Sequence, residues 1–172
     1  FDEKGFIVNQ GELTGVGYGK GTSPNNGCGW ISVYNALKML GEDPEPFEIM
    51  REVEDGALFA GTVGTDPLYI QRYLRQKGYD AQIYFVREDV EREARQSDAN
   101  IWTYGWYSGW NDKIGAHFVA YGRDPNDPKD GEMTFYNGER SDSGITGRYK
   151  GPLEEHYLNA DIFRMMICIN KK

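Results

Sequence analysis

The chain has 172 residues, with 19 basic and 27 acidic side chains and a formal net charge of −8. This length suits one domain that buries its own core, so we expect a single domain over residues 1–172. The acidic balance and the lack of any lysine or arginine run argue against binding to nucleic acid or to an anionic membrane surface.

The supply of metal ligands is small, since the chain has only two cysteines and two histidines. Cys28 and Cys168 lie far apart, and no recognised spacing yields a disulfide framework or a zinc site, so we expect no metal and no cofactor. A single disulfide stays open. No stretch resembles a membrane span or a signal peptide. Because the chain begins with Phe1 rather than Met, we expect a trimmed or processed form, assumed monomeric, either cytoplasmic or secreted.

Residues 1–24 are expected to form an irregular, glycine-rich lead-in on the surface. Their run G-V-G-Y-G-K-G has neither the spacing of a dinucleotide fingerprint nor the Gly-Lys-Ser/Thr ending of a phosphate loop. Residues 25–80 then read as a helical half. Its first helix begins at Cys28, directly after the turn-forming residues 24–27, and ends at Gly41. Apolar residues surround most of this helix, which is typical of a helix inside a domain.

Two amphipathic helices are predicted next. One covers Pro46 to Glu54, and the other takes Asp66 as its cap and ends at Gly78. Residues 81–172 are predicted to form a sheet half, because the apolar period changes to two. Its strands are expected over residues 81–86, 101–107, 116–122, 132–136 and 163–170, with a charged helix over 88–96 and a helical turn over 152–158. Helices first and strands later predict an α+β domain with an antiparallel sheet.

Cys28 is the first candidate for chemistry, because it occupies the first turn of the central helix. The free N–H groups and the macrodipole of a helix N-terminus favour an anion, so we expect the pKa of this thiol to be lowered. The same N–H groups can receive the negative oxygen that forms when a thiolate attacks a carbonyl. Cys168, within an apolar strand, is expected to be inert core.

His117 and Asn137 complete the candidate site. His117 lies in the apolar strand G-A-H-F-V-A-Y-G, and Asn137 ends the strand M-T-F-Y-N. A cysteine nucleophile needs a base for its proton, and the base needs a third group to fix its ring. Cys28, His117 and Asn137 fit these roles in this order. His156 is an alternative histidine, and Asp142 an alternative orienting group.

The runs N-N-G-C-G-W-I-S-V-Y-N-A-L, G-A-H-F-V-A-Y and F-Y-N-G resemble papain-like cysteine peptidases. The likeness is greatest with a small bacterial branch that includes the bacteriocin-leader, or double-glycine, peptidase domains of ABC exporters. The resemblance covers roughly residues 25–138 and implies the papain-like fold, with the cysteine helix packed on the sheet. It also implies that Cys28 is the nucleophile, His117 the general acid/base and Asn137 the group that orients the imidazole.

One position departs from the family pattern. These peptidases usually carry a glutamine about six residues before the cysteine, where it completes the oxyanion hole, and this chain has Thr22 there. Asn26, Asn25 or Gln10 could replace it, the last only if the lead-in folds back. Substrate contacts are expected from Trp110, in the loop that leads to His117, and from Gly115 and Trp30. The aromatic stripe that includes Trp102, Tyr104 and Trp106 could line a cleft or form core.

We therefore predict a cysteine-dependent peptidase or amide hydrolase that acts on a peptide or amide substrate through a thioester acyl-enzyme. An acyltransferase would use the same Cys28 and His117. A papain-like module whose catalysis has lapsed, and which binds a peptide or glycan, is the alternative from a different class.

Overall fold

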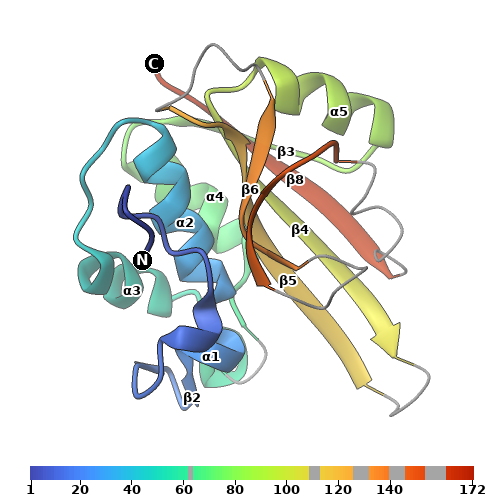
Figure 1. The fold of residues 1–172 in the computed structure, drawn as a ribbon. Helices are drawn as coiled ribbons and strands as arrows, with labels where there is room; N and C mark the ends of the chain where they lie inside the picture. Colours follow the sequence, from blue (N-terminus) through green and yellow to red (C-terminus); the bar gives the residue numbers. More distant parts are fainter. Residues whose placement is uncertain (62–63, 109–112, 126–131, 140–145, 154–161) are drawn as a thin grey trace.

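The computed structural model describes residues 1–61, 64–108, 113–125, 132–139, 146–153 and 162–172. A helical layer built from the N-terminal half packs against one face of a twisted sheet, and a single helix covers part of the other face (Figure 1). This architecture confirms the predicted α+β class. In the described part of the chain, no helix is long and apolar enough to cross a membrane.

The sheet has six antiparallel strands in the order β3-β8-β4-β5-β6-β7. Their bounds are Asp80–Tyr84 for β3, Ala99–Ser108 for β4, Lys113–Arg123 for β5, Met133–Glu139 for β6, Thr146–Lys150 for β7 and Phe163–Asn170 for β8. The five predicted strands are confirmed with modest changes of bounds. Strand β7 was not predicted, because T-G-R-Y-K lacks the apolar alternation that marks a strand.

The central helix is α2, Cys28–Met39, in which every residue except Lys38 is buried. It ends where Gly41 adopts a φ of +80°, the left-handed conformation that glycine accepts without strain. A short helix α1, Ser23–Asn26, precedes it, although its residues were expected to form only a turn. Helix α2 packs on the sheet face that carries Phe118, Ala120 and Ile167, as its all-round apolar character predicts.

Helices α3, Pro46–Glu54, and α4, Pro67–Gln76, flank α2 as predicted (Figure 1). Each begins with proline in its first turn and with an acidic cap: the carboxylate of Glu45 accepts the N–H of Glu48, and that of Asp66 accepts the N–H of Leu68. Such caps satisfy N–H groups that a helix start leaves unpaired.

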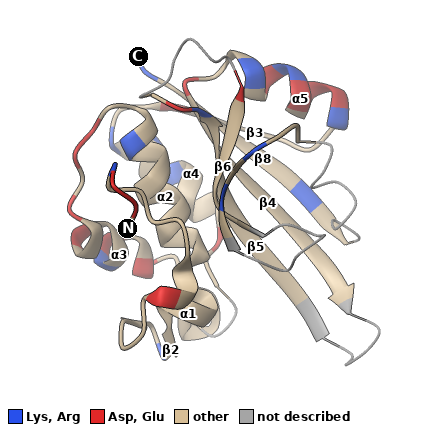
Figure 2. Ribbon diagram, viewed as in Figure 1, with Lys and Arg blue, Asp and Glu red and all other residues tan. Residues whose placement is uncertain are grey.

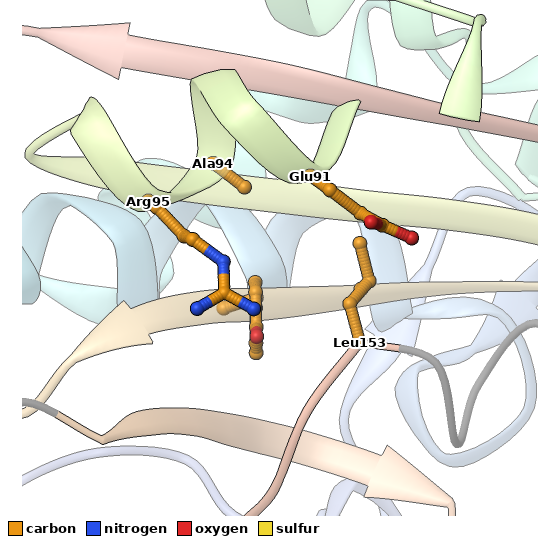
Figure 3. A pocket seen from close by; sticks show the side chains of 5 residues that line it. Glu91, Ala94, Arg95 and Leu153 are labelled. Atoms are coloured by element: carbon orange, nitrogen blue, oxygen red, sulfur yellow. The ribbon is translucent and has the colours of Figure 1, made fainter. Parts of the chain in front are cut away.

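Helix α5, Arg87–Gln96, lies on the opposite face of the sheet and carries charge on its outer side (Figure 2). Its inner side buries Val90 and Ala94 against a second core cluster that contains Trp102 and Tyr104. Leu153 points up at this helix from below (Figure 3). The predicted aromatic stripe of β4 therefore serves as core at Trp102 and Tyr104.

The N-terminal segment is more structured than predicted. It contains a 3-10 turn, η1 (Gln10–Glu12), and a short hairpin of β1 (Gly17–Tyr18) and β2 (Gly21–Thr22). Phe6, Ile7 and Tyr18 are fully buried, so the expectation of an irregular surface lead-in is wrong for these residues. Asn35 of α2 holds the segment in place, since its side chain bonds both the N–H and the C=O of Ile7, at 2.9 and 2.8 Å.

Candidate active site

Cys28 begins helix α2 at the point where α1 ends, and only 5% of its surface is exposed. Three main-chain N–H groups face its sulfur: those of Cys28 itself and of Gly29 at the helix start, and that of Phe118 on β5. The helix start and the central strand of the sheet therefore meet at the thiol.

The N–H groups lower the pKa of this thiol, as the sequence argument expects for a helix N-terminus. Burial has the larger effect and raises the pKa to about 11, because removal of water disfavours the thiolate. The expected lowered pKa is thus wrong for the resting structure, in which Cys28 is a protonated thiol at neutral pH.

His117 lies on β5, one residue before Phe118, and is 7% exposed. Its ring meets the ring of Tyr104 edge-on, with the centroids 6.0 Å apart, because the two residues face each other across β4 and β5. Its Nε2 atom is 2.6 Å from the main-chain carbonyl oxygen of Asn137. Burial lowers the pKa of His117, and the contact with this carbonyl opposes that effect.

Cys28 is linked to His117 through the main chain, because the Phe118 N–H that contacts the Cys28 sulfur belongs to the residue after His117. No hydrogen bond joins the Cys28 sulfur to the His117 ring among the described residues, and no charge interaction between them affects either pKa. His117 precedes Phe118 on β5, so its side chain lies on the sheet face of Tyr104, opposite to the face that carries Phe118 and α2. Direct proton transfer therefore requires that the His117 side chain move to the Cys28 side of the sheet. Sequence reasoning missed the Phe118 amide, since only the packing of α2 on β5 brings it to the thiol. It named Tyr104 in the aromatic stripe but not as the neighbour of His117, which follows from the strand register.

Asn137 is fully buried in β6, at a register shift between Phe135 and Gly138. Its φ is +63°, in the left-handed region that asparagine adopts more readily than most residues. Its side chain contacts Gln10 instead of the imidazole: Oδ1 accepts the N–H of Gln10 at 2.8 Å, and Nδ2 donates to Gln10 Oε1 at 2.8 Å.

The three candidates for an oxyanion donor have different surroundings. The lead-in folds back so that Gln10 reaches Asn137, and the Gln10 Nε2 atom donates to the carbonyl of Pro24 at 2.8 Å. Asn26 is half-buried and its amide nitrogen lies against Gly21 of the hairpin, while Asn25 is exposed. Gln10 is the candidate that is bonded to a residue in contact with His117.

Of the three residues expected to contact the substrate, the structure describes Gly115 and Trp30. Gly115 is half-buried on β5, against the ring of Trp106. Trp30 is corrected to a core residue, because it is 1% exposed and its indole N–H donates to Ser23 Oγ at 3.2 Å. Trp110, His156 and Asp142 lie outside the described residues.

Cys168 is buried on β8 and matches the expectation of inert core. Burial raises its pKa to about 12, against a hydrogen bond from Ser97 that lowers it. The two cysteines are not joined in a disulfide. Within the described ranges, no group of three or more His, Cys, Asp or Glu side chains could hold a metal ion.

No protein-family model and no curated protein matches this sequence. Several solved structures resemble the fold, including the following two. One is a double-glycine-motif protease of an AMS/PCAT transporter in complex with its leader peptide, with 16% identity, 84% of each chain covered and a TM-score of 0.53. The other is the peptidase domain of Streptococcus ComA, a bifunctional ABC transporter of a quorum-sensing pathway, with 12% identity, 84% of this chain and 91% of that one covered and a TM-score of 0.52. The chain therefore has the fold of a papain-like cysteine peptidase domain, with Cys28 at the start of its central helix and His117 on its sheet.

Proposed function

We propose that this chain is a cysteine peptidase or amide hydrolase in which Cys28 is the nucleophile and His117 the general base. One observation carries the proposal: the Cys28 thiol, at the N-terminus of a buried helix, abuts the main chain that bears an anchored imidazole. A helix start supplies N–H groups for an oxyanion, and His117, the residue before Phe118 on β5, supplies a proton acceptor.

The reaction begins with transfer of the Cys28 proton to His117 as the sulfur attacks a carbonyl carbon. The negative oxygen so formed is stabilised by the N–H groups at the helix start and by the side-chain amide of Gln10. His117 then gives the proton to the leaving amine, and a thioester remains on Cys28. Water, deprotonated by His117, attacks the thioester and releases the acid, and His117 returns the proton to the Cys28 sulfur. An amine in place of water would make the same site a transferase.

Peptides are the proposed substrate class, because the similar folds are peptidase domains and one of them is bound to a leader peptide. A first substrate series is a set of fluorogenic peptides that end in Gly-Gly, beside matched peptides that end in Ala-Ala. The net charge of −8 favours peptides with basic side chains, through long-range attraction.

The decisive experiment compares hydrolysis across pH in the parent chain, Cys28→Ala, His117→Ala and the control His156→Ala. Because burial lowers the pKa of His117, the parent rate is expected to rise with pH below about pH 6.5 and to hold at neutral pH. Cys28→Ala and His117→Ala should each lose about a thousandfold or more. Activity that survives in either the Cys28→Ala or the His117→Ala variant refutes the proposal.

One observation favours the alternative of a binding module: burial raises the pKa of the Cys28 thiol, and no hydrogen bond between the thiol and the imidazole is found in the described part of the chain. Iodoacetamide labelling separates the two functions, with Cys168 as an internal reference thiol. A hydrolase predicts that Cys28 is labelled at neutral pH faster in the parent than in His117→Ala. A module without catalysis predicts equal, slow labelling in both chains, and peptide binding that Cys28→Ala leaves intact.

A further inference from the structure

We propose that the main-chain carbonyl of Asn137 orients the His117 imidazole, whereas the side chain of Asn137 is a positioning group for Gln10. This inference rests on the proposed function and deepens it, since it gives the main chain and the side chain of Asn137 separate tasks in the site. The side chain of residue 137 then acts on the oxyanion hole and has no direct part in holding the base.

The first half of the proposal follows from the chemistry of the contact. A carbonyl oxygen only accepts hydrogen bonds, so the Nε2 atom of His117, 2.6 Å away, must carry the proton. In a neutral imidazole the other nitrogen, Nδ1, then has a free lone pair. The contact with Asn137 therefore fixes the tautomer whose Nδ1 atom can accept a proton.

The second half follows from the partners of the Asn137 carboxamide. Its oxygen and its nitrogen are both used by Gln10, the first with the main chain and the second with the side chain. This paired contact fixes the plane of the Gln10 amide. Gln10 Nε2 donates one hydrogen to Pro24, four residues before Cys28. Its second hydrogen has no acceptor among the described residues, so it can serve a negative oxygen at the helix start.

The backbone at residue 137 explains why an asparagine suits both tasks. A φ of +63° at the register shift of β6 turns the carbonyl to the imidazole. Glycine adopts this conformation freely and asparagine does so better than most other residues, but only asparagine adds a carboxamide. Asn137→Gly therefore keeps the carbonyl that meets His117 and removes the group that holds Gln10.

The first test reads the histidine tautomer by ¹⁵N NMR of the imidazole rings. The chain has two histidines, so His156→Ala assigns the signals of His117. We expect the Nε2–H tautomer in the parent chain, and the same tautomer and titration in Asn137→Gly. A change of tautomer or titration in folded Asn137→Gly would mean that the side chain holds the ring, and would overturn the proposal.

The second test is a kinetic cycle of Asn137→Gly, Gln10→Ala and the double variant on one fluorogenic peptide. Each single change is expected to lower kcat by about tenfold to a hundredfold with little change in KM, because an oxyanion donor acts mainly in the transition state. The double variant should be no slower than the slower single variant. Losses that multiply would overturn the coupling, since the two groups would then act independently.

These outcomes are separate from a failure of the proposed function. If the parent chain hydrolyses no peptide and His117→Ala leaves Cys28 labelling unchanged, the hydrolase is refuted, while the NMR test still decides which group holds the ring. If the parent is active and the pH profile of Asn137→Gly matches that of His117→Ala, the hydrolase stands and the present inference falls. Thermal melts of all variants confirm that each comparison is made on folded protein.

Discussion

Replacement of Gly29 by alanine tests the packing next to the proposed nucleophile. Gly29 is the second residue of α2, and a Cβ atom there would lie 2.6 Å from Thr65 Cβ and would also meet Thr65 Oγ1. Thr65 is itself buried, and its hydroxyl pairs with the Tyr18 hydroxyl at 2.6 Å. Because a Cβ atom cannot rotate away, the main chain at one of the two residues must move.

Two opposing effects set the magnitude. Alanine is favoured over glycine in a helix interior by about 1 kcal/mol, so Gly29→Ala would stabilise an open helix. Overpacking of a tight core costs about 1–3 kcal/mol, and a clash with a backbone-proximal atom belongs at the upper end. We expect a net loss of about 1–2 kcal/mol in the free energy of unfolding, or roughly 2–8 °C in Tm for a chain of this length.

Urea titration and thermal melting measure this loss. Gly147→Ala on β7 is the control, because a Cβ there meets nothing within 4 Å and the change should leave stability within about 0.5 kcal/mol. A double-mutant cycle with Thr65→Gly identifies the cause, since the cost of Gly29→Ala should fall once the Thr65 side chain is gone. A Gly29→Ala chain as stable as the parent would refute the argument.

Three further changes test other parts of the fold. Asn35→Ala leaves the buried N–H and C=O of Ile7 without partners, so urea titration should show a loss of about 2–4 kcal/mol, with faster proteolysis in residues 1–10. Asp124→Asn weakens a 3% exposed carboxylate that binds Arg148 and Lys4, which are half-buried, so the loss measured in urea should be about 1–2 kcal/mol and should shrink in high salt. The pKa of Cys28 is raised to about 11, so this group favours folding below its unfolded pKa, near 9, and that contribution disappears as the pH rises toward 11. The free energy of unfolding, measured by urea titration, should fall between about pH 8 and about pH 10.5. This fall should be smaller by about 2 kcal/mol in Cys28→Ala than in the parent.

Local patterns in the sequence predicted most of the regular elements. Helix α3 matches its predicted bounds because Pro46 starts it and an apolar residue recurs at each turn. Strand β8 matches because residues 163–170 carry an unbroken β-forming pattern. The elements that carry Cys28, His117 and Asn137 were also predicted, namely a helix start and two strands, whereas the catalytic roles of these residues stay predictions.

The N-terminal segment was not predictable by the same means. Phe6 and Ile7 are buried because Asn35, on a helix much later in the chain, bonds the main chain of Ile7 as a neighbouring strand would. The contact between Gln10 and Asn137 spans 127 positions of sequence. No local pattern encodes such contacts, so the sequence placed Gln10 among three oxyanion candidates without separating them.

The contacts that anchor the N-terminal segment distinguish Gln10 from the other two oxyanion candidates. Before Gln10, the segment is tied to the sheet by ion pairs of Lys4 and Asp2, and to α2 by the pairing of Ile7 with Asn35. The side chain of Gln10 is itself held by the Pro24 carbonyl, to which its Nε2 atom donates. A side chain that is held on both sides loses little further entropy when it donates to a transition state, which is the condition for an effective oxyanion donor. Asn25 is exposed and lacks this support, and the Asn26 amide nitrogen lies against Gly21 of the hairpin. The folded lead-in therefore supports the proposal that Gln10 is the oxyanion donor, although Gln10 lies eighteen residues before the cysteine.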